Sequence, residues 1–523
     1  MPEIRGSWSE VAVAALATVA VLLVGLLFRR KGSQSKRRQL PPGPGGWPIL
    51  GCLPSLSASA HESFYELSKQ YGPLMFMRLG SVKTLVVTSS KFAEKILKTH
   101  DKIMSSRPAF IVTSEIFLGA DIGFAPYGQH WRYLRQVCTL GLLTPTHINQ
   151  FREIREGEVM AVLHFILEES QRGNAVNMGK SLSTMSMNNI TQMMMNQSYC
   201  VHGSSALPPN PLLKVLDEMS ELAGRFNIGD YIPLLKPFDL QGLRKGAKAV
   251  HCMLDKFVDE IIEEHRRRRS IARAENYKDD FVDALLGIGQ TKEFEKPLSM
   301  DTVKGIMLDI IFGGSDTSFI TGLWALTELL RQPRLLRKAQ EELDSVVGPH
   351  RLVQEEDLPK LVYVNAVLKE TLRLHPPVPN MLPHLSVEDC EIEGFHIPSG
   401  TQVLVSPWCI HRDPAVWERP LEFDPERFLN STTDFKGQDF ELLPFGSGRR
   451  MCPGMNLGAL MVIYPLSVLL HALDWALPDG QKFEELDMSY NVGVVLHKKV
   501  PLTVLGTARL PHHVLYPAQQ VNQ

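Results

Sequence analysis

The sequence predicts a mainly α-helical body with a minor β-sheet, an α+β fold. Apolar residues recur at helical spacing over long stretches, the strand-like runs are few and short, and no second linker or internal repeat follows Ile49. Of the 523 residues, 44% are hydrophobic and 21% are charged. These ordinary values exclude a disordered chain, a collagen and a polytopic membrane protein.

Charge and cysteine content narrow the class further. The 55 Lys and Arg residues nearly balance 57 Asp and Glu residues, so the net charge of −2 gives no sign of a nucleic-acid partner. The seven cysteines are scattered and form no CxxC pair. We therefore expect a reduced compartment, with neither a disulfide framework nor a cysteine-rich zinc site.

The N-terminal segment predicts a membrane anchor. Residues 1–10 precede an uninterrupted apolar run, Val11–Phe28, which is long enough to cross a bilayer as a helix. Arg29, Arg30 and Lys31 follow it, which predicts a lumenal N-terminus and a cytosolic body. A cleaved signal peptide is the alternative, but it would carry its positive charge before the apolar run rather than after it.

Residues 29–48 predict a basic and proline-rich hinge. The stretch Leu40–Pro48 contains four prolines, which fit neither a helix nor an inner strand. It predicts a stiff spacer between the membrane and a single body over residues 49–523. We expect this body to lie on the cytosolic side of the membrane.

The spacing of apolar residues and the positions of prolines predict the helices and strands of the body. Leu361–Leu374 should end before Pro376, because the residue before a proline disfavours the α conformation. Five methionines between Met185 and Met195 predict core packing rather than a metal site. The other expected helices are His61–Tyr71, one within Ala125–Leu143, Val250–Arg269, Asp301–Leu330, Gln332–Val347 and Met455–Leu473. The expected strands are Leu74–Leu79, Thr84–Val87, Gln402–Ser406 and Val500–Val504.

Two helical positions carry candidate chemistry. Gly313 and Gly314 lie inside the longest predicted helix, where each glycine costs about 1 kcal/mol relative to alanine. The gain would be a close approach of a ligand to the backbone, with Asp316 and Thr317 supplying an acid and a hydroxyl. A flexible stretch with a polar face is the alternative. Further on, Glu370 and Arg373 are three residues apart on one helix and can pair.

One cysteine stands in an unusual loop. Gly446, Gly448 and Gly454 surround Cys452, which precedes the last long helix. The helix N-terminus and the neighbouring arginines favour a thiolate. Such a cysteine can be a nucleophile, a redox sensor, a metal ligand or an inert thiol.

At this point the sequence resembles a known family. Phe445, Gly448, Arg450, Cys452 and Gly454 match the FxxGxRxCxG signature of the haem-thiolate monooxygenases, the cytochromes P-450. Three more motifs occur in the family's order: 370–373 resembles its ExxR motif, 425–428 its PERF motif and 313–318 the (A/G)GxDT(T/S) segment of its central helix. The chain looks like plant-type, microsomal members, and the resemblance implies the cytochrome P-450 fold.

The resemblance implies a role for each motif. Cys452 would be the axial ligand of the iron of haem b, and its loop would include Phe445 and Gly448. Asp316 and Thr317 would form the catalytic proton-delivery pair. Glu370, Arg373 and Arg427 would form a structural triad. The haem propionates would be bound by Trp131, Arg135, His384 and Arg450.

Family position also suggests an apolar substrate pocket. Its candidate residues are Ile111, Val112, Phe117, Phe312, Gly313, Val378 and Val494. The expected reaction inserts one oxygen atom from dioxygen into an apolar or aromatic small molecule. A phenylpropanoid or flavonoid is the suggested substrate, and a terpenoid or another specialised metabolite is the alternative.

The resemblance also implies partners and rivals. Electrons would come from an NADPH-dependent flavoprotein reductase, so NADPH and flavins would act only through that partner, and Arg132, Arg135 and Arg449 are its suggested docking residues. One rival is a haem-thiolate isomerase or dehydratase acting on peroxides, and another is a haem-binding sensor or carrier without turnover. Asp316 and Thr317 argue against both rivals.

Overall fold

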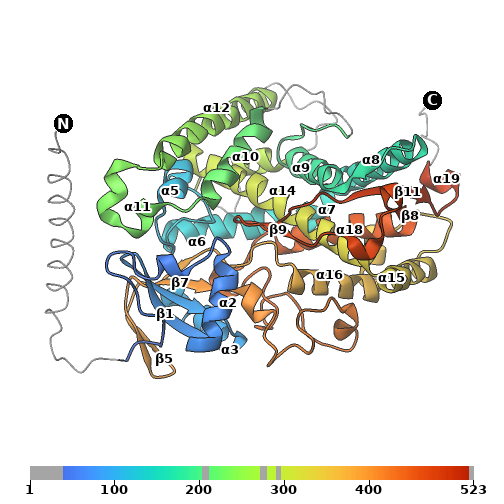
Figure 1. Cartoon of the computed structure of the whole chain (residues 1–523). Helices are drawn as coiled ribbons and strands as arrows, with labels where there is room; N and C mark the ends of the chain where they lie inside the picture. The colour runs from blue at the N-terminus through green and yellow to red at the C-terminus, as the bar shows by residue number, and fades with distance from the viewer. Residues whose placement is uncertain (1–38, 203–210, 271–278, 290–295, 517–523) are drawn as a thin grey trace, which may run out of the picture.

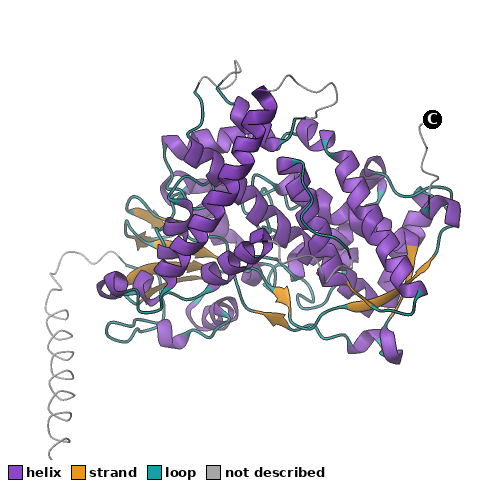
Figure 2. Ribbon diagram, turned by 90° about the horizontal axis from the view of Figure 1, so that it is seen from above, coloured by secondary structure: helices purple, strands orange, loops and turns teal. Residues whose placement is uncertain are grey.

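The structure is a computed structural model that describes residues 39–202, 211–270, 279–289 and 296–516. The predicted anchor at 11–28 and the first part of the hinge lie outside the described residues. Helices form the bulk of the body, and the strands lie toward its margins (Figure 2). The mainly helical class is therefore confirmed.

Eighteen α-helices occur in the described ranges. They are α2 (Ala60–Tyr71), α3 (Ser90–Glu94), α4 (Asp101–Met104), α5 (Ile111–Phe117), α6 (Gln129–Gln136), α7 (Pro145–Gln150), α8 (Arg152–Gln171), α9 (Met178–Met195), α10 (Pro211–Gly224), α11 (Ile228–Tyr231), α12 (Leu243–Ser270), α13 (Phe281–Gly287), α14 (Met300–Arg331), α15 (Pro333–Val346), α16 (Val362–Leu374), α17 (Pro407–Ile410), α18 (Met455–Ala472) and α19 (His512–Leu515). Short 3₁₀ or π turns include η3 (Val137–Leu142), η4 (Pro233–Phe238), η6 (Pro425–Phe428), η7 (Gly448–Arg450) and η9 (Phe483–Glu485), with four more at Leu53–Ser55, Lys95–Thr99, Glu355–Lys360 and Pro478–Gly480.

The long helices match the sequence pattern closely. Helices α2, α14, α15, α16 and α18 each begin and end within one residue of their predicted bounds. Helix α12 begins seven residues earlier than expected, and α6 occupies only the middle of its predicted range before η3 continues it. The 20-residue α8 and the 14-residue α10 were not predicted. The five methionines lie on α9 and are all buried, which confirms core packing.

Four small sheets replace the single minor sheet that was predicted. The largest has the order β1-β2-β7-β4, formed by Leu74–Leu79, Val82–Val87, Gln402–Val405 and His384–Leu385. A three-stranded sheet has the order β3-β11-β8, formed by Val176–Asn177, Thr503–Ala508 and Leu473–Ala476. The others pair β5 (Cys390–Ile392) with β6 (Phe395–Ile397) and β9 (Tyr490–Asn491) with β10 (His497–Lys498). The expected strand at 500–504 begins three residues later, as β11.

Helix α14 crosses the middle of the molecule and joins its two largest apolar clusters (Figure 1). Residues 303–311 of α14 pack in one cluster with α9, α12 and α13, and residues 323–330 pack in the other with α15, α16 and α18. The glycine-containing segment 313–318 lies between these two clusters. The fold thus places this segment where the packed core is interrupted.

Length and composition alone would allow two described helices to span a membrane. These are α14 and α18, and 50% and 72% of their most apolar windows are buried inside the body. They are core helices by packing. Composition alone does not distinguish such core helices from membrane spans, because burial in a core and burial in lipid select the same residues.

Candidate functional site

The Cys452 loop is held in one shape by glycines and backbone hydrogen bonds. Gly446 and Gly448 have φ values of 72° and 69°, a region that favours glycine. A Cβ on Gly448 would lie 2.2 Å from the carbonyl oxygen of Leu97, so no other residue fits there. The amide of Cys452 donates to the carbonyl of Phe445 at 2.9 Å. The sulfur is thereby held just before the start of α18.

The Cys452 residue keeps solvent-accessible surface, although many protein atoms lie around its thiol. Burial raises the pKa of its thiol, while the Gly454 amide and the positive charge of Arg135 partly counter that effect. Two effects thus oppose each other at the free sulfur: burial favours the neutral thiol, whereas the Gly454 amide and Arg135 favour the thiolate that the sequence predicts. Binding a cationic metal would supply the missing stabilisation, since coordination deprotonates a thiol.

The adjacent glycines Gly313 and Gly314 of α14 serve different purposes. A Cβ on Gly313 would meet nothing within 4 Å, so this face of the helix borders open space. A Cβ on Gly314 would lie 2.7 Å from Cδ1 of Ile190, so that face packs tightly against α9. Thr317 Oγ1 donates to the carbonyl of Gly313 at 2.8 Å, which places its hydroxyl beside the open space. The alternative of a merely flexible stretch does not explain this asymmetry.

The Cys452 loop and α14 meet at the first turn of α18. A Cβ on Gly458 would lie 3.7 Å from Cε1 of Phe445 and 4.0 Å from Oγ of Ser318 on α14. Glycine thus allows the loop, α18 and α14 to approach one another. The structure brings together the predicted cysteine segment and the predicted glycine segment.

A group of buried cations lies near the Cys452 loop. Arg450 stacks on the ring of Trp131 at 4.1 Å, and both donate to the carbonyl of Ile122. Arg135 donates to the carbonyl of Met451, and His384 Nδ1 lies 2.9 Å from that of Met104. These four residues are the predicted propionate partners, and all four side chains make hydrogen bonds to neutral backbone carbonyls.

Arg107 is a fifth member of this group, and the sequence motifs did not identify it. It donates to the carbonyls of Gly123, Leu382 and Pro383. Burial and the charge of Arg450 lower the pKa of Arg107 to about 9, and burial lowers the pKa of Arg450 to about 10. Burial and both arginines hold the pKa of His384 well below its usual value. Buried cations that repel one another suit a ligand bearing two carboxylates, so these residues fit haem.

The predicted triad forms in the interior. Glu370 and Arg373 are fully buried and joined by two hydrogen bonds of 2.7 and 2.9 Å, and Arg427 Nε donates to Glu370 Oε1 at 3.1 Å. The amide of Asp424 also donates to this carboxylate, at 2.7 Å. A surface pair would contribute little, but this fully buried arrangement fixes three chain segments to one another.

His411, which no sequence motif indicated, connects the triad to the Cys452 loop. Arg373 donates to the carbonyl of His411 at 2.6 Å, and His411 Nδ1 lies 3.1 Å from the carbonyl of Arg373. The amide of Leu443, two residues before Phe445, donates to His411 Nε2 at 2.9 Å. Burial and the charge of Arg373 lower the pKa of His411 to about 3, so the ring stays neutral and able to accept this bond.

Two neighbouring acidic residues, Asp121 and Asp309, connect the loop before α6 to α14. The sequence did not indicate this pair. Asp309, one turn before Gly313, accepts the amide of Ile122 at 2.6 Å. Asp121 accepts the amide of Phe124 at 2.5 Å. Burial and the neighbouring charge of Asp121 raise the pKa of Asp309 well above its usual value. The only sequence signal was an acid on the apolar part of the central helix.

The predicted substrate-contact residues divide into two groups. Ile111, Val112 and Phe117 on α5 are buried, and the last two belong to the apolar cluster around α12. The remaining four keep accessible surface: Phe312, Gly313, Val378 and Val494. The backbone of Val494 lies 3.6 Å from the Cβ position of Gly224 at the end of α10. Their role in substrate contact stays a prediction.

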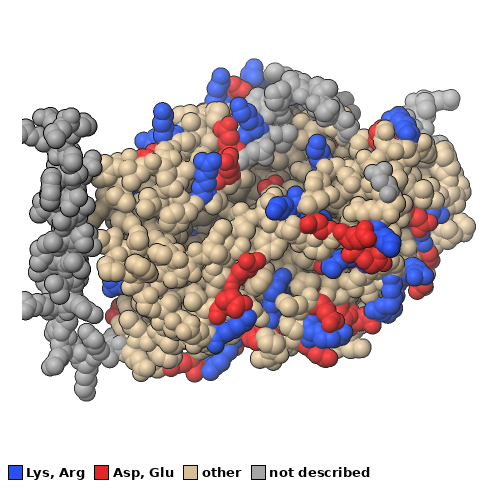
Figure 3. All heavy atoms as spheres, viewed as in Figure 1, with Lys and Arg blue, Asp and Glu red and all other residues tan. Residues whose placement is uncertain are grey.

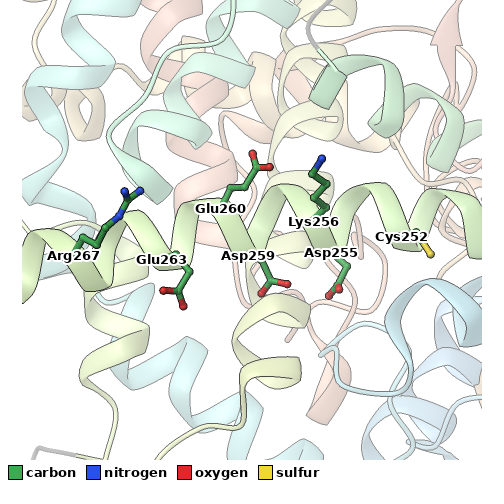
Figure 4. A pocket seen from close by; sticks show the side chains of 7 residues that line it. All are labelled: Cys252, Asp255, Lys256, Asp259, Glu260, Glu263 and Arg267. Carbon is green, nitrogen blue, oxygen red and sulfur yellow. The ribbon is translucent and has the colours of Figure 1, made fainter.

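A surface hollow on α12 differs from the predicted site in that charged side chains line most of it. It is lined by α12 residues alone, most of them charged, which Figure 4 shows along one helix: Cys252, Asp255, Lys256, Asp259, Glu260, Glu263 and Arg267. Ligand pockets are enclosed and mostly apolar. This hollow is therefore the solvated face of a helix.

Comparison with known proteins agrees with this geometry. The family model described as Cytochrome P450 matches residues 41–504. A flavonoid 3'-monooxygenase of Crocosmia x crocosmiiflora is 41% identical over 94% of this chain and 96% of its own length. A flavonoid 3',5'-hydroxylase of Campanula medium is 37% identical over 96% and 97%, and a cytochrome P450 of Panax ginseng is 41% identical over 91% and 94%. Among solved structures, a zebra fish cytochrome P450 with progesterone superposes with a TM-score of 0.71 at 28% identity, covering 86% of this chain and 99% of that one.

Proposed function

Because the chain belongs to the cytochrome P450 family, and so to the haem monooxygenases, we propose that it hydroxylates an aromatic small molecule of the flavonoid or phenylpropanoid type. Three kinds of support converge on this proposal. They are the names of several similar plant proteins, the open space beside Gly313, and the apolar side chains around it. The open space beside Gly313 on α14 is the observation that carries the proposal.

We propose a division of labour among the residues that hold the cofactor. Cys452 would bind the iron, and Arg107, Arg135 and Arg450 with Trp131 and His384 would bind the two propionates. Phe445 and Gly448 shape the loop that presents the sulfur. When bound, haem supplies the iron chemistry that cleaves dioxygen and transfers one of its atoms to the substrate.

Helix α14 would supply the groups that deliver protons and the space for the reactants. Gly313 leaves room for substrate and dioxygen, and the Thr317 hydroxyl lies at the edge of that room. Asp316, the preceding residue, provides a carboxylate that can deliver protons toward Thr317. Replacing Thr317 with alanine is expected to leave haem bound while diverting reducing equivalents to hydrogen peroxide. Unchanged product yield per NADPH would remove Thr317 from the mechanism.

A reductase assay tests the activity. Full-length protein in microsomes with a plant NADPH-dependent reductase should consume NADPH faster when substrate is added, and should release a hydroxylated product. Omitting the reductase should abolish turnover. No reductase-dependent product from any member of a broad panel would refute the monooxygenase activity.

The panel also tests the substrate class. It should contain flavonoids and phenylpropanoids with one ring hydroxyl, matched terpenoids of similar size, and simple alkanes. We expect the aromatic compounds to give product with an added ring hydroxyl, detected by mass. A strict preference for terpenoids would overturn the substrate proposal and leave the enzyme class intact.

Membrane attachment is part of the proposal, with residues 1–10 lumenal, 11–28 spanning the endoplasmic reticulum membrane, 29–48 as hinge and 49–523 as the cytosolic body. The described part offers support in a group of exposed apolar side chains. Leu234 and Phe238 on η4 are 84% and 70% exposed, and Trp47 in the hinge is 65% exposed. These segments are neighbours, because Gly80 donates to Leu50 and Ser81 donates to Tyr231.

This apolar region lies on the side where the described chain begins. In Figure 3 the left part of the molecule carries few charged side chains, whereas charges gather toward the lower right. Exposed apolar surface beside a predicted anchor is typical of a membrane-facing surface. Alkaline extraction should leave the full-length protein in the membrane, and added protease should digest the body in intact microsomes. Protection of the body would reverse the proposed topology.

The electron donor would be an NADPH-dependent flavoprotein reductase that docks on the Cys452 side. Of the suggested docking residues, Arg132 on α6 is exposed. Arg449 is paired with Asp101 at 2.6 Å, and Arg135 is turned inward to the Met451 carbonyl. Arg132 is therefore the one we expect to matter for docking. Charge reversal at Arg132 should raise the reductase concentration needed for half-maximal turnover.

A further inference from the structure

The acidic residue of the central helix faces an imidazole from the far end of the chain. His497 Nε2 on β10 lies 3.7 Å from Asp316 Oδ2 on α14, an ion-pair distance slightly longer than a hydrogen bond. The His497 side chain is 42% exposed and that of Asp316 is 28% exposed. The pair thus runs from the solvent toward the interior.

Several contacts fix the position of His497. Its strand β10 pairs with β9, with His497 opposite Asn491. Next to it, the amide of Leu496 donates to Pro377 at 2.9 Å, and Trp324 Nε1 on α14 donates to the Leu496 carbonyl at 3.2 Å. The imidazole ring lies 5.9 Å from the ring of Phe319, one turn beyond Asp316 on the helix. The imidazole is therefore positioned over this part of α14 by the fold.

Other ionisable groups nearby are directed elsewhere. Lys498, next in sequence, donates to the Asp487 carbonyl and lies over the Trp324 ring. Tyr490 on β9 donates to Glu62. His497 is thus the ionisable side chain of this hairpin that the structure aims at Asp316.

Asp316 is the sequence neighbour of Thr317, whose hydroxyl donates to the carbonyl of Gly313, and the free face of Gly313 borders open space. Asp316 is therefore the residue that links the His497 imidazole, by their contact, to Thr317, by their adjacency on one helix. Exposed ion pairs contribute little to stability, so stability alone does not account for the pair.

We propose that His497 is the proton entry point for oxygen activation. Hydroxylation of a substrate by dioxygen consumes two electrons and two protons, because the second oxygen atom leaves as water. In each transfer the protonated imidazole gives its Nε2 proton to the Asp316 carboxylate, which passes a proton on toward Thr317. The neutral imidazole then takes a proton from solvent. Imidazole suits this task because it exchanges protons near neutral pH.

This inference rests on the proposed function, and replacing His497 with glutamine tests it. Glutamine keeps the size and polarity but carries no transferable proton at neutral pH. We expect product formed per NADPH to fall about 3- to 10-fold, less than a full general acid contributes, since water can substitute in part. Hydrogen peroxide should rise correspondingly, and the deuterium solvent isotope effect on product formation should increase. The CO-difference spectrum and substrate affinity should stay unchanged.

A double-mutant cycle separates a relay from a structural role. In an Asp316→Asn background, His497→Gln should have almost no further effect on product per NADPH, because its acceptor is gone. The control His513→Gln, at an exposed histidine of α19, should match the wild type. The relay would be refuted if His497→Gln formed as much product per NADPH as the wild type. It would also be refuted if the two substitutions lowered product per NADPH independently of each other. Absence of turnover in the wild type would instead refute the proposed function.

Discussion

A chain of hydrogen bonds supports the loop that carries Cys452, whereas around Gly313 the structure leaves space. On the cysteine side, buried charges and backbone bonds run without a break from Glu370 through Arg373 and His411 to Leu443. On the α14 side, the decisive feature is a missing side chain: nothing lies within 4 Å of the Cβ position of Gly313.

We therefore expect substitutions on the two sides to have different effects on stability and turnover. Damage on the cysteine side breaks a dense network, so it should cost folding stability and cofactor retention together. A substitution on the open face of α14 fills the space beside Gly313, so it should lower turnover and leave the folding stability intact. Five substitutions test this contrast.

Replacing Cys452 with alanine should have the largest effect. The reduced, CO-bound protein should lose the red-shifted Soret band of a thiolate ligand, and monooxygenation should be abolished, because no other group can donate the thiolate electron density. The matched control is Cys252→Ala, at an exposed cysteine of α12, which should keep both. A persisting band in Cys452→Ala would mean that another cysteine binds the iron.

Replacing Glu370 with alanine should be the most destabilising change of the network. It leaves two arginines without their shared carboxylate, one of them fully buried, and should lower the free energy of unfolding by about 3–5 kcal/mol. The control is Glu426→Ala, which also loses two cationic partners, Arg334 and Lys338, but at the surface. It should cost less than about 1 kcal/mol in a denaturant titration. Equal losses would show that burial of the triad is energetically unimportant.

The adjacent glycines of α14 offer the sharpest comparison within one helix. Gly313→Ala should keep or raise stability by up to about 1 kcal/mol, since alanine favours the helix and fills space. Its turnover should fall about tenfold or more, because a methyl group displaces the reactants. Gly314→Ala should instead lose about 1–2 kcal/mol by pressing on the buried Ile190. Thermal unfolding and turnover measured on both variants would reveal any reversal of this pattern.

The smallest effect concerns His411 and emerges only on acidification. Its pKa is about 3 in the folded protein and near 6.5 in the unfolded chain, so the unfolded state binds an extra proton between those values. Stability from this group is full above pH 6.5 and is lost as the pH falls toward 3. Between pH 7.5 and 5.5 the wild type should lose about 1 kcal/mol more than His411→Gln in urea titrations. Parallel losses would exclude His411 as a source of acid sensitivity.

Much of this outcome could be read from local pattern. The long helices α14, α16 and α18 were predicted within a residue because their apolar spacing and flanking prolines or glycines are local signals. Helix α8 was missed because its buried residues alternate with many charges, among them Arg155, which is buried against Glu355. The Cys452 loop and the Glu370 motif were recognised because their residues are close in sequence.

The remaining parts of the site needed the folded chain. Arg107, His411 and His497 come from segments remote from most of the residues they contact, and an isolated arginine or histidine has no local signature of a distant partner. The balance at the Cys452 thiol also depends on the folded chain, because the loop and Arg135 favour a thiolate while burial by the body opposes it.

By itself the sequence determined the fold class, the family resemblance, the cysteine that would bind iron and the glycines of the central helix, because spacing along one chain is enough to encode them. Only the tertiary structure decided which glycine faces open space and which faces the core, that several cations gather near the loop, and that an imidazole from the last strands meets Asp316. These are properties of distance and burial between segments, and they exist only once the chain has packed.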